Sequence, residues 1–191
     1  MNGITRYSKS IPVGVTLTTL LLTACGGSHS DHSVPDALCG TRVSRTIAKP
    51  LLQPMHKVTE WTSAGFREAG ETSWCVVFVG DDDALHLKFA SHGGPMSPMK
   101  AASPDNSVTG LQNARPLPRI PLADMAVGAD DGAIATTRCK DGSGADHFTL
   151  ALKVTRGEFD AERRVAIERF MRAYMPATVK TLHCQEKRPS R

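Results

Sequence analysis

The sequence predicts an α+β domain in which an antiparallel sheet of two β-hairpins is packed by an N-terminal and a C-terminal helix and held by two disulfide bonds. Three observations support this fold class. Two pairs of strand-forming segments are each joined by a short polar turn. Amphipathic segments with helical spacing flank these pairs on either side. Four cysteines lie within the same region.

The first predicted element is a short amphipathic helix. Val43, Ile47 and Leu51 recur every fourth residue with polar and basic residues between them, and Pro50 marks the end. The segment 57–67 that follows has no clear period. Its expected buried members are Val58, Trp61 and Phe66.

The first hairpin is the clearest strand signal in the chain. Residues 72–79 are almost all β-forming, and an aspartate-rich turn leads from them to a second run at 84–90. In that run Leu85, Leu87 and Phe89 alternate with polar residues, which is the period of a half-exposed strand.

A long connection separates the two hairpins. Residues 91–123 contain six prolines and three glycines, and connections of this length are usually functional or disordered. A second hairpin follows, with strands predicted at 133–140 and 147–156.

The last predicted element is a helix that Asp160 can cap. Ile167, Phe170, Met171 and Tyr174 form an apolar stripe facing the core, and we expect Pro176 to end or kink the helix. The order of helix, hairpin, loop, hairpin and helix suggests an imperfect internal duplication.

The amino terminus has the layout of a secretory signal. Arg6 and Lys9 precede an apolar run of twelve residues from Ile11 to Leu22. A membrane-spanning helix needs about 20 residues, so this run is too short for a permanent span.

The end of that run resembles a bacterial lipobox. Leu22, Thr23 and Ala24 place an aliphatic residue and two small residues before Cys25. The resemblance implies that the Cys25 sulfur receives a diacylglyceryl group and that cleavage makes Cys25 the first mature residue. Two acyl chains are enough for stable anchoring. We therefore expect a lipoprotein on the extracytoplasmic face of the cell membrane, with an outer membrane as the alternative.

This processing predicts the domain organisation. Residues 1–24 are the expected signal peptide, 25–36 a lipidated flexible tether, 37–186 a single domain and 187–191 a disordered tail. Loss of Arg6 and Lys9 lowers the net charge from +4 to +2. A chain this close to neutral is not expected to bind nucleic acid.

Lipidation of Cys25 leaves an even number of cysteines, and an exported chain with four predicts two disulfide bonds. Four cysteines allow three pairings. We favour Cys39 with Cys75 and Cys139 with Cys184, since each pair would tie a helical segment to the strands of its own half. A four-thiolate zinc site is disfavoured because the short Cys-x-x-Cys spacing is absent.

From Cys25 to Cys184 the arrangement is similar to small actinobacterial envelope lipoproteins with four cysteines in an α+β domain, many of which have no assigned activity. The resemblance implies an envelope location and carries no catalytic residue to this chain. No phosphate-binding loop, nucleotide fingerprint, His-Glu-x-x-His helix or serine elbow is present, so no enzymatic activity is predicted.

The sharpest metal hypothesis is a copper(I) site at the start of the long loop. His86, His92, Met96 and Met99 offer soft imidazole and thioether ligands. The interpretation favoured over copper is an exposed loop whose methionines cover the sheet edge, and no cofactor is predicted.

Three further groups have simpler structural interpretations. The histidines of the tether would bind metal only adventitiously, the aspartate clusters suit tight turns better than calcium, and the arginines of the last helix suit a solvated face better than lipid. Two other histidines are expected at strand edges or partly buried. These groups are His29, Asp31 and His32; Asp81 to Asp83 with Asp130 and Asp131; Arg163, Arg164, Arg169 and Arg172; and His147 and His183.

The functional prediction is a non-enzymatic, lipid-anchored domain that binds a ligand or an envelope partner, a protein or a cell-wall component, through the loop from Ser91 to Ala123. A copper-handling protein is the alternative class, and an envelope hydrolase is a weaker third.

Overall fold

The computed structural model describes residues 34–53, 56–68, 70–106, 109–140, 142–182 and 184. The predicted signal peptide, Cys25, most of the tether and the tail lie outside these residues. Within the described part of the chain, no helix is both long and apolar enough to cross a membrane.

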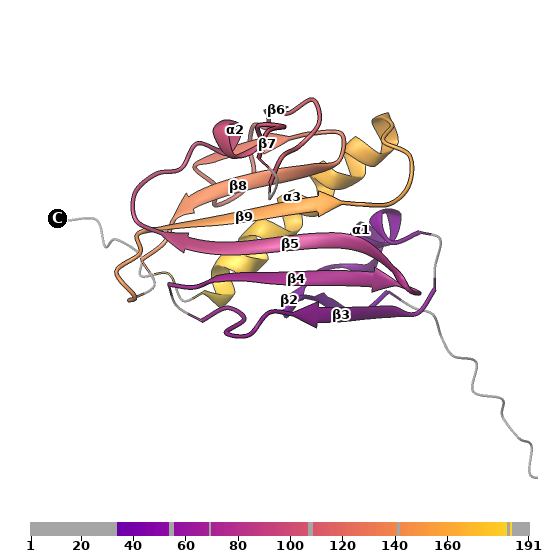
Figure 1. The fold of residues 1–191 in the computed structure, drawn as a ribbon, viewed down its shortest axis with the longest axis horizontal. Helices are drawn as coiled ribbons and strands as arrows, with labels where there is room; N and C mark the ends of the chain where they lie inside the picture. Colours follow the sequence, from indigo (N-terminus) through magenta and orange to yellow (C-terminus); the bar gives the residue numbers. More distant parts are fainter. Residues whose placement is uncertain are drawn as a thin grey trace, which may run out of the picture. The chain divides into compact units, whose positions relative to one another are not determined.

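The domain is α+β and is built on one antiparallel sheet of seven strands (Figure 1). The strands are β3 (Val58–Thr62), β4 (Thr72–Val79), β5 (Asp82–His92), β6 (Arg115–Pro116), β7 (Met125–Gly128), β8 (Gly132–Arg138) and β9 (His147–Val154). Their order in the sheet is β3-β4-β5-β9-β8-β7-β6. The two predicted hairpins are present as β4–β5 and β8–β9, but β5 is longer and β8 and β9 end earlier than predicted. Three shorter strands extend the sheet at its edges.

Strands β5 and β9 join the two hairpins at the centre of the sheet. They pair antiparallel from Leu85 opposite Val154 to His92 opposite His147. After β5 the chain crosses to the far edge and returns through β6, β7 and β8. The N-terminal half of the sheet contributes three strands, β3 to β5, and the C-terminal half contributes four, β6 to β9. Because the first half is preceded by a helix and the second is followed by one, the layout is not a simple duplication.

The C-terminal helix α3 (Ala161–Thr181) covers one face of the sheet (Figure 1). The Asp160 carboxylate caps it by accepting a hydrogen bond from the Arg163 backbone N–H at 2.7 Å. Pro176 lies inside the helix and does not end it. Proline removes one intrahelical hydrogen bond, but Met175 and Thr178 are buried and hold the last turns against the core.

The predicted N-terminal helix is shorter than expected. Helix α1 spans Arg45–Ala48 and continues into the 3₁₀ helix η1 (Lys49–Leu51). Ahead of it, β1 (Ala37–Leu38) and β2 (Thr41–Arg42) form a small two-stranded sheet. Val43 follows β2 directly and is buried there outside any helix, which is why its spacing to Ile47 gave a false helical start.

The core lies between α3 and the inner face of the sheet. Its largest fully buried side chains come from α3, the central strands and the N-terminal segment: Tyr174, Phe148, Phe170, Leu38, Leu51, Leu52, Leu85, Leu87, Ile167, Leu150 and Leu152. The Tyr174 hydroxyl donates to the Leu38 carbonyl at 2.7 Å, and burial raises the pKa of Tyr174 to about 12. Trp61, expected to be buried, is 56% exposed because β3 is an edge strand whose outer face is uncovered.

Two disulfide bonds close the domain in the pairing that the sequence favours. Cys39, in the β1–β2 turn, is bonded to Cys75 in β4. Cys139, after β8, is bonded to Cys184 beyond the end of α3.

The outer face of the sheet carries a second, smaller apolar cluster. Its buried residues come from β7, the β7–β8 turn, β8, β9 and the long loop: Ala102, Leu111, Val127, Ala129, Ile134 and Ala151. The loop contains a short helix α2 (Pro98–Ala101) and lies over this face. We call residues 93–106 and 109–114 the roof loop.

Candidate functional site

A cavity of about 400 Å³ lies between the roof loop and the outer face of the sheet. Its floor consists of alternate residues of three neighbouring strands: Lys88 and Ala90 on β5, Thr149 and Ala151 on β9, and Ile134 on β8. Successive strand residues point to opposite faces, so these five share the outer face. Because Ala90 and Ala151 have only methyl side chains, they leave the space above the sheet unfilled.

The wall of the cavity comes from the roof loop. Its residues are Met96, Ser97, Lys100, Ala101, Asn106 and Thr109. Ser97 caps α2 by accepting a hydrogen bond from the Lys100 N–H at 3.4 Å, and the Thr109 hydroxyl donates to the Ala101 carbonyl at 2.7 Å. These local bonds fix the shape of the wall.

Two adjacent aspartates of the β7–β8 turn hold the end of the roof loop. The Asp131 carboxylate accepts a hydrogen bond from the Gln112 N–H at 2.8 Å, and Asp130 accepts one from the Asn113 side-chain amide at 2.7 Å. The Asn113 hydrogen bond, with Arg164, lowers the pKa of Asp130. The pair thus does more than make the tight turn that its sequence indicates.

A lysine strengthens the same anchor. Lys153 on β9 donates to the Gly110 carbonyl at 2.7 Å, and its Nζ lies 3.4 Å from the Asp131 carboxylate. The Asp131 side chain is only 2% exposed, so this carboxylate is buried and paired. The cavity wall is therefore fixed to the sheet by charge-assisted hydrogen bonds.

Two cations face the cavity. Burial lowers the pKa of Lys88, whose Nζ lies 5.0 Å from the centre of the Trp74 ring. Lys100 is exposed on the wall. Within the described part of the chain neither lysine forms an ion pair with a carboxylate, in contrast to Lys153 on the same face.

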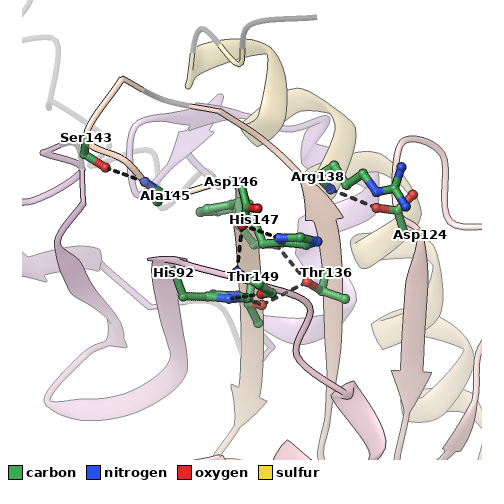
Figure 2. A network of polar contacts seen from close by, with 11 residues as sticks. His92, Asp124, Thr136, Arg138, Ser143, Ala145, Asp146, His147 and Thr149 are labelled. Carbon is green, nitrogen blue, oxygen red and sulfur yellow. Dashed lines mark hydrogen bonds and ion pairs between the residues drawn. The ribbon is translucent and has the colours of Figure 1, made fainter. Parts of the chain in front are cut away.

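A polar network borders the cavity at the end of β5 and includes Thr149 of its floor (Figure 2). His92 Nε2 is hydrogen-bonded to the Thr149 hydroxyl at 2.8 Å, and His92 Nδ1 donates to the Gly94 carbonyl at 2.9 Å. The Thr149 hydroxyl also lies 3.2 Å from that of Thr136. Both ring nitrogens of His92 are thus used within the protein.

Asp146 ties the start of the roof loop to β9 in the same network (Figure 2). Its Oδ1 accepts hydrogen bonds from His147 Nδ1 at 2.6 Å and from the Gly94 N–H at 2.7 Å. The bond with His147, followed by that with Gly94, lowers the pKa of Asp146. His92 and His147 are cross-strand partners, and their rings stack with centres 5.9 Å apart.

The structure does not gather the four predicted copper ligands. His86 is hydrogen-bonded to Asp83 at 2.7 Å and lies six residues before His92 on one strand, which corresponds to roughly 20 Å. Met96 belongs to the cavity wall and Met99 is 40% exposed. The copper hypothesis remains a prediction for His92 and the two methionines alone.

The other sequence-predicted groups have structural contacts. Arg164 pairs with Asp130, Arg172 donates to the Arg119 carbonyl at 2.6 Å, and Asp82 pairs with Arg156 at 3.3 Å. His29, Asp31, His32 and His183 lie outside the described residues. Among the described histidines, cysteines, aspartates and glutamates, the only closely gathered group of three is Cys39, Glu60 and Cys75, and its two sulfurs are bonded to each other.

A shallow groove also runs between α1 and α3. It consists of two adjoining hollows of about 530 and 690 Å³ that share Thr46, Pro50, Glu162 and Ala166. One hollow is lined by Glu158, Asp160 and Arg163, so opposite charges are mixed there. The two hollows have larger volumes than the loop–sheet cavity because they are more open to solvent. The charged side chains that line the loop–sheet cavity are all cations, so it is the stronger candidate site.

The sequence indicates the loop that forms the wall but not the floor of the cavity. Lys88 falls in the predicted strand 84–90, and Thr149 and Ala151 fall in the predicted strand 147–156, so the sequence places them in separate hairpins. The alternation along each strand puts them on one face, and this is their only signal in the sequence. Their proximity depends on the β5–β9 pairing, which joins residues about 60 positions apart and leaves no local pattern. Comparison of the chain with protein-family models, with curated proteins and with solved structures found no match.

Proposed function

We propose that this chain is a membrane-anchored extracytoplasmic lipoprotein whose domain binds a small ligand in the cavity between the roof loop and the sheet. The observation that carries the proposal is the cavity itself. Its volume of about 400 Å³ lies within the range of about 300–1,000 Å³ that is typical of small-molecule sites. It lies under the loop that the sequence selects for binding.

The construction of the cavity supports a binding role. The wall is fixed at one end by Asp131 and Lys153 and at the other by Asp146 and His92. A site whose wall is already ordered loses less conformational entropy when a ligand binds. The anchors also hold polar groups of the wall at set positions around a floor that is apolar at Ala90, Ile134 and Ala151.

The location rests on different observations. The Leu22-to-Cys25 motif supports lipidation, and two disulfide bonds suit an oxidising extracytoplasmic compartment. Mass spectrometry of the chain purified from membranes tests the anchor. The proposal predicts a diacylglyceryl-modified Cys25 at the mature amino terminus, and a Cys25→Ser variant that is neither lipidated nor membrane-bound.

Thermal unfolding tests the binding function. The mature, oxidised chain is screened against copper, zinc, calcium, lipid head groups, cell-wall fragments and small amphiphiles. A ligand at 100 times its dissociation constant adds about 2.7 kcal/mol, which raises the melting temperature by several degrees at this chain length.

A matched pair of variants locates the binding. Ala151→Leu adds three carbons to the floor of the cavity, and Val76→Phe adds four carbons on the same sheet face outside it. Stabilisation by a ligand should disappear in the Ala151 variant and persist in the Val76 variant. Equal stabilisation of both variants would place the binding elsewhere and contradict the proposal.

A further inference from the structure

The charge of the cavity selects one chemical class of ligand. Its described lining contains two amines, Lys88 and Lys100, and no carboxylate. Ser97, Asn106, Thr109 and Thr149 add neutral polar groups. A lining with cations and no acid is complementary to an anion and repels a cation.

Lys88 is the more informative of the two lysines. It is half-buried beside small apolar residues, and burial lowers the pKa of its ammonium group. Its ammonium group lies over the face of Trp74, whereas Lys153 on the same sheet face has the buried Asp131 carboxylate. An anion in the cavity would supply the countercharge that Lys88 lacks and would offset its desolvation.

The rest of the lining is apolar and leaves little room. Ala90, Ala151 and Ile134 form the floor beside Lys88, and Met96 adds a flexible thioether side chain to the wall. A volume of about 400 Å³ is at the small end of the range for ligand sites. The ligand should therefore combine a charged head with a short apolar body.

We infer that the cavity binds a small amphipathic anion, an inference that rests on the proposed function. The anionic head contacts Lys88 and Lys100, and the short apolar chain lies on the alanine-lined floor. A carboxylate and a phosphate share the head-group chemistry that two ammonium groups recognise. The proposed ligand therefore has one anionic head group, which is either a carboxylate or a phosphate.

Calorimetric titration of the mature, oxidised chain tests the class with probes that share an eight-carbon chain. The probes are octanoate, octyl phosphate, 1-octanol and octylammonium, all used below their aggregation limits. Octanoate or octyl phosphate should bind at least about tenfold more tightly than octanol, the effect of one charge-assisted hydrogen bond. Octylammonium should bind most weakly. Preference between the two anions distinguishes a carboxylate from a phosphate head, and either supports the inference.

Single substitutions test the two contacts. Lys88→Met keeps most of the length of the side chain and removes its charge. It should weaken binding of the preferred anion about tenfold while changing octanol affinity less than about twofold. Lys100→Met should weaken anion binding about threefold, because an exposed amine is screened by water. Lys57→Met, an exposed lysine just before β3, is the control and should have no effect.

The outcomes separate this inference from the proposed function. Equal affinity for octanol and the anions, or tighter binding of octylammonium, overturns the anion inference but retains a ligand cavity if Ala151→Leu abolishes binding. Binding that survives in Ala151→Leu overturns both. If none of the probes binds, the small-amphiphile inference fails, and the wider thermal screen alone decides the proposed function.

Discussion

Replacing Asp131 with alanine should loosen the roof loop and destabilise the domain. The substitution removes the acceptor of the Gln112 N–H hydrogen bond, 2.8 Å long, and the partner of Lys153 at 3.4 Å. Both losses occur at a side chain that is only 2% exposed. The wall of the cavity would then lose one of its fixed ends.

The magnitude follows from these two contacts. A hydrogen bond to a charged group contributes roughly 1.5–3 kcal/mol. Lys153 is 42% exposed and can be rehydrated, so loss of the ion pair adds at most about 1 kcal/mol. The expected destabilisation is about 3 kcal/mol, which corresponds to a fall of roughly 6–12 °C in melting temperature for a chain of this size.

Two measurements check this prediction. Thermal unfolding gives the loss of stability, and hydrogen exchange should show faster exchange of the Gln112 amide in Asp131→Ala than in the unmodified chain. Asp105→Ala, at an exposed position of the same loop, is the control. Equal melting temperatures for the two variants, with unchanged exchange at Gln112, would refute the anchoring role.

Three further changes test other parts of the fold. Gly132→Ala should cost at least about 2 kcal/mol in urea unfolding, because the added methyl group would overlap the Leu152 carbonyl oxygen of the neighbouring strand; a loss below about 0.5 kcal/mol contradicts that packing. The double variant Cys139→Ser, Cys184→Ser opens a 45-residue loop and should lose about 4 kcal/mol, and an unchanged melting temperature would show that the bond contributes nothing. The pKa of Asp146 is lowered, so its stabilising effect is present above its unfolded pKa of about 3.9 and is lost as the pH falls through the folded value. Acid titration of unfolding should therefore show a steeper loss between about pH 5 and pH 2 in the unmodified chain than in Asp146→Asn, and parallel curves would contradict the assigned hydrogen bonds.

Local patterns were enough to predict the central hairpins and the last helix. Leu85, Leu87 and Phe89 alternate over a run long enough to identify a strand, and the stripe ending at Tyr174 spans two helical turns. The strands that were missed are short. Strand β7 has four residues and ends in Gly128, and β6 has two residues and contains Pro116, so neither carries a readable period.

The sequence predicts the loop that forms the wall of the candidate site, but it does not predict the floor. Composition selects the loop, because six prolines between two hairpins are unusual. The floor depends on the pairing of β5 with β9, which no local pattern specifies. Asp131 illustrates the limit: its neighbours in sequence indicate a turn, but its buried contacts are with Gln112 and Lys153.

The most direct test of the ligand cavity is amide chemical-shift mapping of the mature, oxidised chain titrated with octanoate. The largest shifts should cluster at Lys88 and Ala90 on β5, at Thr149 and Ala151 on β9, and along α2. Shifts concentrated between α1 and α3, or spread evenly over the surface, would contradict the assignment of this cavity as the binding site.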